Sequence, residues 1–433
     1  MSLISTKKDI KELTVSVYQN NFGLVREKRN INPTDKEEKI YYLDVADLIE
    51  INSIIVENIE AYEINYDYDV LNSINILEKF IGKEVVLYDP DSGKKVHGIL
   101  LSTAGGYIIE DMKTNEVYVS PKGEIILPCI PKGFTLKPTI SFKACPTDEN
   151  TFTISYLTKG LVWIANYSIE LFNQYLSLKC FAKINNFAGI DFKNTKVNLV
   201  SGDIKRVQEP PVKPVYETGF MLKAASDLGG VPPTALGDNY IYNYPCPTDL
   251  NNNASKQLQL FWSKNVRYIK YYINPFNGNE LSTVIEFKNS KESNLGEPLP
   301  NGVAQVYDRP KNRDNFEFIG ESRIDYTPED ELVKLELGRP FNIVFDKVQT
   351  DYKRLEGLEE YEYEITIKNT GNEEALLKIT HFISGDWKMI SSTDRFTKKD
   401  ANTIEFDVTV PPRTEKKITF RYSVVVTENN REF

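Results

Sequence analysis

Apolar and polar residues alternate along much of this chain, and this period of two restricts its fold more than any other feature. Residues 361–368 place tyrosine and isoleucine at odd positions and glutamate, threonine and lysine at even ones, and residues 401–410 and 416–426 alternate similarly. Strands with one buried face produce this pattern, whereas helices need a period near 3.6. Only residues 44–50 and 72–80 suit short helices. The sequence therefore predicts an all-β protein.

The composition supports this expectation and removes some functions. The 25 tyrosines and 22 phenylalanines suit pleated sheets, on which broad side chains pack well. A net charge of −10 argues against nucleic-acid binding, which requires a basic surface. With only 2 histidines, sites rich in histidine are not expected.

The length of 433 residues predicts several domains. Clusters of turn-forming residues recur at short intervals, as they do in sandwiches and barrels. We expect immunoglobulin-like or other β-sandwich domains plus a small SH3-like barrel. The expected units are an N-terminal β segment or sandwich (1–62), the small barrel (63–135), a central sandwich (136–205 and 256–346) interrupted by an insertion (206–255), and a C-terminal immunoglobulin-like sandwich (347–433).

The insertion at 206–255 is rich in proline and is far longer than an ordinary loop. It also carries aromatic residues, which a purely disordered linker would lack. We therefore expect it to dock, either on its own chain or on a neighbouring subunit. The candidate partner contacts are Tyr216, Phe220, Tyr240, Tyr242 and Tyr244.

One local pattern appears three times: an alternating strand ends in asparagine and a short polar turn follows. The asparagines are Asn186, Asn289 and Asn369. Asparagine stabilises turns by hydrogen bonding to nearby backbone. The pattern predicts three strand–turn corners in related sheets, with three equivalent ligand loops as the alternative.

Two charged stretches have competing interpretations. Glu360, Glu362 and Glu364 share one face of a predicted strand, which favours a solvated face or a guarded sheet edge over a divalent-cation site. Residues 261–273 mix lysine and arginine with aromatics, a pattern that also occurs in grooves for single strands or sugars. We favour one strand with a buried and an exposed face.

No sequence motif assigns a catalytic residue, a cofactor-binding residue or a metal ligand. P-loop, dinucleotide-binding and G-x-S-x-G patterns do not occur. The spacing of Cys129, Cys145, Cys180 and Cys246 matches no zinc or redox site, so we expect reduced thiols. The N-terminus lacks a signal-peptide pattern and no apolar stretch has membrane-spanning length. The expected location is cytoplasmic, with a surface or spore layer reached by a signal-independent route as the alternative.

Several segments resemble a bacterial family of unknown function, the mucoidy-inhibitor-A-like group. Residues 156–167 (YLTKGLVWIANY), 186–192 (NFAGIDF), 199–203 (LVSGD), 296–302 (GEPLPNG) and 385–387 (GDW) are similar to motifs of that family and occur in its order. The resemblance implies an all-β fold but no established activity, cofactor or catalytic residue.

The chain departs from that family at three positions. Ala188 stands where serine or threonine is usual, Tyr326 where histidine is frequent, and Asn342 where aspartate is frequent. If these positions carried chemistry in the family, this chain would be a poor enzyme.

We therefore expect a non-enzymatic structural or interaction protein without cofactors. It would bind a protein partner or self-assemble through its sandwich edges and the 206–255 insertion. Two alternatives remain: a module that binds a carbohydrate or envelope polymer, and a hydrolase that depends on carboxylates or a metal. Nucleic acid and a membrane span are not expected.

Overall fold

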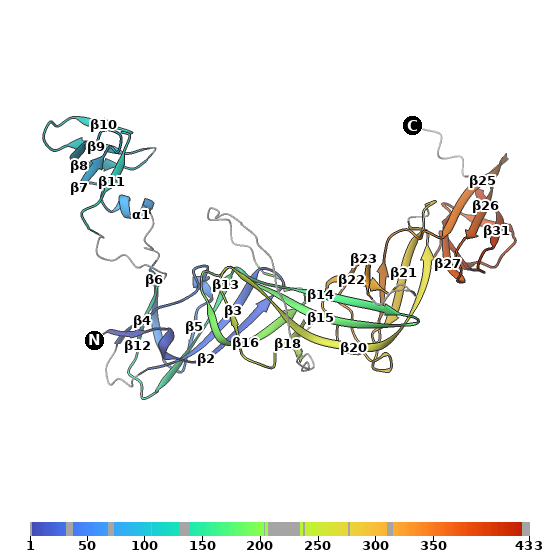
Figure 1. The fold of residues 1–433 in the computed structure, drawn as a ribbon, viewed down its shortest axis with the longest axis horizontal. Helices are drawn as coiled ribbons and strands as arrows, with labels where there is room; N and C mark the ends of the chain where they lie inside the picture. Colours follow the sequence, from blue (N-terminus) through green and yellow to red (C-terminus); the bar gives the residue numbers. More distant parts are fainter. Residues whose placement is uncertain are drawn as a thin grey trace.

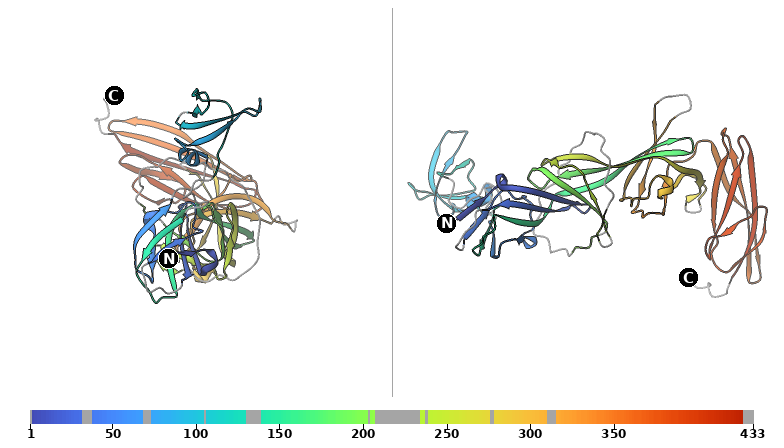
Figure 2. Two further views of the ribbon diagram at one scale, coloured as in Figure 1. Left: turned by 90° about the vertical axis from the view of Figure 1, so that its left-hand side faces the viewer. Right: turned by 90° about the horizontal axis from the view of Figure 1, so that it is seen from below.

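A computed structural model gives the fold of this chain and describes residues 2–31, 38–67, 73–104, 106–129, 139–202, 204–206, 234–236, 239–275, 278–309 and 315–426. The protein is all-β and multi-domain, as the alternation predicts. Its units follow one another along the longest axis, with the five strands β7–β11 near the N-terminal end and the last sheet at the other (Figures 1 and 2).

The N-terminal unit contains two sheets. The smaller has the order β1-β4-β12-β6, with β1 at Ser2–Ser5, β4 at Glu38–Tyr42, β12 at Thr139–Ala144 and β6 at Ala61–Asp67. The larger has the order β17-β18-β16-β2-β3-β13-β5, and β19 also pairs with β16. Its strands are β2 (Ile10–Tyr18), β3 (Phe22–Asn30), β5 (Ile55–Glu57), β13 (Thr151–Lys159), β16 (Phe192–Ser201), β17 (Thr234–Leu236), β18 (Asn239–Asn243) and β19 (Thr248–Leu250).

This pairing differs from the division expected from sequence. Strands of the N-terminal segment 1–62 pair with β12, β13 and β16, so these stretches form one unit. Within the segment 206–255, β18 and β19 both add to β16. Alternation identifies strands but not their partners, so pairing between distant strands cannot be read from it.

A small separate sheet has the order β10-β9-β8-β7-β11. Its strands are β7 (Glu84–Tyr88), β8 (Lys95–Ser102), β9 (Ile108–Asp111), β10 (Val117–Val119) and β11 (Glu124–Ile126). Its first strand pairs with its second and its fifth, and it has its own core around Leu100 and Ile109. The expected helix at 72–80 forms as α1 (Ser73–Glu78), whereas 44–50 contains no α-helix.

A ten-stranded sheet links the middle of the molecule to its C-terminal unit. Its main path is β23-β22-β14-β15-β20-β27-β30-β29, and β21 and β24 join it beside β20. The strands are β14 (Leu161–Phe172), β15 (Tyr175–Asn186), β20 (Ala254–Ile273), β21 (Ser282–Lys288), β22 (Gly302–Asp308), β23 (Glu317–Ile324), β24 (Leu332–Glu336), β27 (Ala375–Phe382), β29 (Thr397–Lys398) and β30 (Thr403–Val410).

The last sheet has the order β25-β26-β31-β28, with β25 at Ile343–Leu355, β26 at Leu358–Asn369, β31 at Glu415–Val425 and β28 at Trp387–Ser392. Apolar residues of β26 and β31 share a core with those of β27 and β30, so the C-terminal unit is a sandwich. Three 3₁₀ turns complete the described elements: η1 (Lys7–Asp9), η2 (Ile51–Ser53) and η4 (Lys291–Ser293).

A buried ion pair ties the two N-terminal sheets together. Glu27 and Arg29 on β3 are only 2% and 0% exposed, and the Arg29 Nη2 to Glu27 Oε2 distance is 2.5 Å. The Tyr42 hydroxyl on β4 donates to the same oxygen at 2.6 Å, and Arg29 Nη1 donates to the carbonyls of Ser5 and Leu43. Burial, followed by the charge of Glu27, raises the pKa of Tyr42, so this hydroxyl stays protonated and donates.

We predict that Arg29→Met destabilises the protein by about 3–5 kcal/mol, because it leaves the Glu27 charge buried without its partner. The double variant Glu27→Gln/Arg29→Met removes both charges and keeps an acceptor for Tyr42. It should therefore lose less stability than the single variant. Urea unfolding of both proteins measures the difference, and equal losses would show that the isolated charge is not the cause.

Candidate functional site

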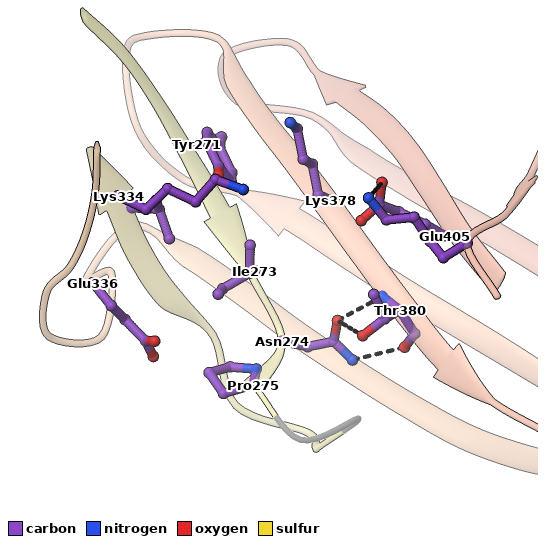
Figure 3. Close-up of a pocket in the computed structure, with 11 residues that line it drawn as sticks. Tyr271, Ile273, Asn274, Pro275, Lys334, Glu336, Lys378, Thr380 and Glu405 are labelled. Atoms are coloured by element: carbon purple, nitrogen blue, oxygen red, sulfur yellow. Dashed lines mark hydrogen bonds and ion pairs between the residues drawn. The ribbon is translucent and has the colours of Figure 1, made fainter. Parts of the chain in front are cut away.

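A pocket of about 370 Å³ lies where the middle of the molecule meets the C-terminal unit, and we call it the junction pocket (Figure 3). Strands β20, β21 and β24 supply one side, and β27, β30 and the turn after β29 supply the other. Its lining residues are Tyr271, Ile273, Asn274, Pro275, Val284, Lys334, Glu336, Lys378, Thr380, Lys399 and Glu405.

The pocket exists because β20 runs beyond the first part of the sheet. Its last two residues pair in parallel with β27, where Ile273 lies opposite Lys378. Asn274 follows the strand and is only 2% exposed. Its Oδ1 accepts from the backbone N–H of Thr380 at 2.7 Å, and its Nδ2 donates to the Thr380 carbonyl at 2.9 Å (Figure 3). The side chain thus continues the ladder where the strand ends and fixes the two sides of the pocket.

Each lysine that lines the pocket has a carboxylate or an aromatic ring beside it. Lys399 Nζ lies 2.9 Å from Glu405 Oε1, and Lys334 Nζ lies 3.5 Å from an oxygen of Glu286 just behind the lining. The ammonium of Lys378 lies 4.5 Å from the centre of the Tyr271 ring. Each ammonium is therefore held beside a carboxylate or an aromatic ring before any ligand binds.

The Tyr271 hydroxyl donates to Glu286 Oε2 at 2.8 Å. Burial, and then this bond to a carboxylate, raises the pKa of Tyr271. The phenol stays neutral at ordinary pH, so it serves as a donor and as a surface for Lys378 rather than as a base.

The pocket could hold a small polar ligand with a negative group. Three ammonium groups lie with two lining carboxylates, and Glu286, which pairs with Lys334, supplies a third, so the charges of the pocket balance. The Lys334 and Lys399 side chains are about half exposed or more, whereas their partners Glu286 and Glu405 are only 11% and 12% exposed. Displacing either carboxylate would leave it nearly buried without its partner, so a ligand anion would have to meet the exposed side of these lysines while both ion pairs stay intact.

The acidic run on β26 lies on one sheet face, where its glutamates are partly exposed and paired with basic residues of the neighbouring strand. Arg421 on β31 bonds to Glu360 and Glu362, with Nη2 2.8 Å from an oxygen of Glu362, and Lys417 lies 2.9 Å from Glu364. Among the residues that the structure describes, no three His, Cys, Asp or Glu side chains are grouped as metal ligands. The acidic charges are neutralised by the neighbouring strand.

The basic and aromatic stretch 261–273 lies in the second half of β20 and is a strand, as expected, but its two buried residues are five positions apart, so no single face of the stretch is buried throughout. Tyr271 is 4% exposed and Val266 is fully buried. Trp262 is 41% exposed, but Lys264 Nζ lies 3.6 Å from its ring centre and Lys179 lies 4.9 Å away on β15. The lysines occupy the ring surface that a base or sugar would need.

The predicted partner contacts divide into two groups. Tyr216 and Phe220 lie outside the described residues. Tyr242 on β18 is 4% exposed, packs edge-on against Trp163 and donates its hydroxyl to the Pro298 carbonyl at 2.9 Å. Tyr240 and Tyr244 are half-buried against the same core. This part of the segment therefore docks on its own chain, and its contact with a partner stays a prediction.

The three repeated asparagines form equivalent corners, as predicted. Asn186 and Asn369 end β15 and β26, Asn289 directly follows β21, and all three are at most 1% exposed. Each Oδ1 accepts from a backbone N–H of the following turn, and each Nδ2 donates to carbonyls of that turn or of a more distant strand end. These bonds satisfy buried backbone groups, which explains the recurrence of asparagine.

We predict that Asn369→Ala lowers the free energy of unfolding by about 2–4 kcal/mol, because it leaves several buried backbone groups without partners. Asn372→Ala is the matched control, since Asn372 is exposed and only accepts from Arg413. Thermal unfolding of both variants tests this. Equal small losses would contradict a structural role for the corner.

The two histidines occupy different surroundings. His97 on β8 is exposed, with Nδ1 3.3 Å from Glu84. His381 on β27 is 3% exposed, and its ring contacts those of Tyr363 and Phe420. Its Nε2 lies 3.3 Å from the Tyr422 hydroxyl, while Nδ1 has no partner among the described atoms. Burial, and then the charge of Lys347, lowers the pKa of His381 to about 3.

We predict that the C-terminal unit loses stability as the pH falls from about 6.5 towards 3. The unfolded chain takes up a proton near the ordinary pKa of 6.5, whereas folded His381 resists protonation down to about 3. His381→Phe removes this dependence while keeping a ring in the aromatic core. The thermal midpoint of the variant should therefore fall less with acid than that of the parent protein, and parallel curves would contradict the assignment.

Sequence reasoning did not find the junction pocket. Lys334 and Lys378 come from β24 and β27, Lys399 comes from the turn after β29, and the three share no motif. They meet only because β20 pairs with β27, a parallel contact between residues about 100 positions apart. No local signal in the sequence reports that contact.

Cys180 is buried, Cys129 and Cys246 are exposed, and none of these three takes part in a disulfide among the described residues. In the described part of the chain, no helix has both the length and the apolar character to cross a membrane. The chain matches none of the protein-family models with which it was compared, and no curated protein matches it either.

Proposed function

We propose that this chain is a non-enzymatic interaction protein that associates with further copies of itself through the exposed edge of its C-terminal sandwich. The observation that carries the proposal is strand β25, which pairs only with β26 in its sheet. Val344 and Val348 on its outward face are 55% and 49% exposed, and Phe341 just before it is 98% exposed. Exposed apolar residues gathered along a sheet edge are typical of interaction surfaces.

Features of the same strand favour a limited contact over open-ended strand addition. Lys347 points inward and is 9% exposed, and a bulge interrupts the ladder between Gln349 and Asp351. Inward charges and bulges are devices by which sheet edges avoid continuous pairing. The two valines would therefore meet a partner surface through their side chains.

A second copy of this chain suits that surface. Val344 lies opposite Lys368 and Val348 lies opposite Glu364 on β26, so both signs of charge flank the apolar pair. If two copies meet with these faces related by a two-fold axis, Val344 and Val348 of one copy contact the same residues of the other. Lys368 of each copy then lies near Glu364 of the other. The segment 206–255 would contribute further contacts where it is accessible.

We predict that Val344→Lys/Val348→Lys weakens self-association at least ~100-fold, because four buried valines in the dimer would become charged. Ile164→Lys is the control, because Ile164 is 43% exposed and lies on β14, which belongs to a different sheet from β25. Sedimentation equilibrium of the full chain measures the mass. A monomer at all micromolar concentrations, or equal effects of both changes, would refute the proposal.

Ligand binding at the junction pocket is the second candidate function. Its size and its polar lining support a carbohydrate or envelope-polymer unit as the ligand. Retention of full-length protein on immobilised polysaccharide, and its loss in Lys378→Gln, would support this candidate; no retention would remove it. A carboxylate-dependent hydrolase is a less favoured alternative, supported only by the presence of both Glu336 and Glu405 in the lining. Turnover that persists after both become glutamine would refute it.

A further inference from the structure

A second cavity, of about 290 Å³, opens at the side of the N-terminal unit, and we call it the Glu27 cavity. It is bounded by η1 and the start of β2, by the segment 190–194 leading into β16, and by Glu27 of β3. Its walls include the apolar side chains of Ile10, Leu13, Ile190 and Phe192. No residue of the junction pocket takes part in it.

Glu27 gives this cavity a polar inner end. The Glu27 side chain is only 2% exposed, yet it lines the cavity. Its three described hydrogen bonds, two from Arg29 at 2.8 and 2.5 Å and one from Tyr42 at 2.6 Å, all end on Oε2. None of these three bonds ends on Oε1, and a carboxylate oxygen that faces a cavity can accept from a ligand donor.

The outer part of the cavity carries the opposite charge. Lys7, Lys11 and Lys193 line it, with Asp191 as the only other carboxylate besides Glu27 in the lining. Lys7 donates to the Asp191 carbonyl at 3.0 Å, and Lys193 lies between two carboxylates, 3.5 Å from Asp249 and 3.9 Å from Asp191. Lys11 is exposed and makes no ion pair with a described residue. Because Glu27 is already neutralised by Arg29, the lining has a net positive charge.

We propose that the Glu27 cavity binds a small anionic polyol, such as a phosphorylated sugar. A hydroxyl of the ligand donates to Glu27 Oε1, its carbon skeleton packs against Leu13 and Phe192, and its anionic group meets Lys11 at the rim. A hydrogen bond from a ligand hydroxyl stabilises the Glu27 carboxylate inside the cavity, and an anionic group is attracted to the exposed ammonium group of Lys11. The cavity therefore favours a ligand that has a hydroxyl at one end and an anionic group at the other.

The test is calorimetric titration of the full chain with glucose 6-phosphate, for which we expect a Kd of about 1 mM or tighter. Cyclohexyl phosphate keeps the ring and the anion but lacks ring hydroxyls, so it should bind ~10-fold more weakly or worse if Glu27 accepts a hydroxyl. Glucose and inorganic phosphate, which each supply one end only, should also bind at least ~10-fold more weakly.

Three variants locate the site. Lys11→Gln should weaken glucose 6-phosphate binding ~10-fold, whereas Lys8→Gln, an exposed neighbour that does not line the cavity, should leave it unchanged. Ile10→Trp fills the cavity and should abolish binding while the thermal midpoint shows that the protein is folded.

Four results would overturn the proposal. The first is no binding of glucose 6-phosphate to the parent protein. The second is equal affinity for glucose 6-phosphate and inorganic phosphate, which would indicate an unspecific anion contact. The third is equal weakening by Lys8→Gln and Lys11→Gln. The fourth is equal affinity for glucose 6-phosphate and cyclohexyl phosphate, because Glu27 would then accept no ligand hydroxyl.

Discussion

The continuity of β20 is the constraint on which the arrangement of this protein depends. The strand has 20 residues and so spans roughly 65 Å. Its first part pairs with β15, its last part with β21, and its final two residues with β27. A strand cannot bend freely without losing its ladder bonds, so one element sets the distance between the units that it joins. The elongated shape in Figures 1 and 2 follows from this span.

The junction pocket is a consequence of the same strand. Where β20 ends, Asn274 replaces further ladder bonds with bonds to Thr380, and the lysines of β24 and β27 come to face one another. In the N-terminal unit, a buried ion pair joins the two sheets. Arg29 donates to the carbonyls of Ser5, which ends β1, and of Leu43, which follows β4, while Glu27 neutralises its charge. Such buried pairs add little net stability but strongly oppose any arrangement that separates them.

The strand at residues 361–368 and the three asparagine corners could be predicted from the sequence. Alternation marked residues 361–368 as a strand and placed Glu360, Glu362 and Glu364 on one face, because side-chain direction follows directly from a period of two. The three asparagine corners were also readable, since asparagine after a strand has a local reason to occur. By contrast, the turn at residues 44–50 was expected to be helical. There Arg29 binds the Leu43 carbonyl and Ala188 accepts from the N–H of Asp47, so tertiary contacts override a weak local preference.

The sequence by itself determined the all-β class, the presence of several units and the faces of the strands, because these depend on neighbours one or two residues away. Only the tertiary structure decided that segment 1–62 shares sheets with 139–201, that Tyr242 is buried, and that Lys334 and Lys378 line one pocket. Those outcomes depend on which strands pair across 100 residues or more. Backbone hydrogen bonds are alike for every pair of strands, so the sequence carries no local record of the choice.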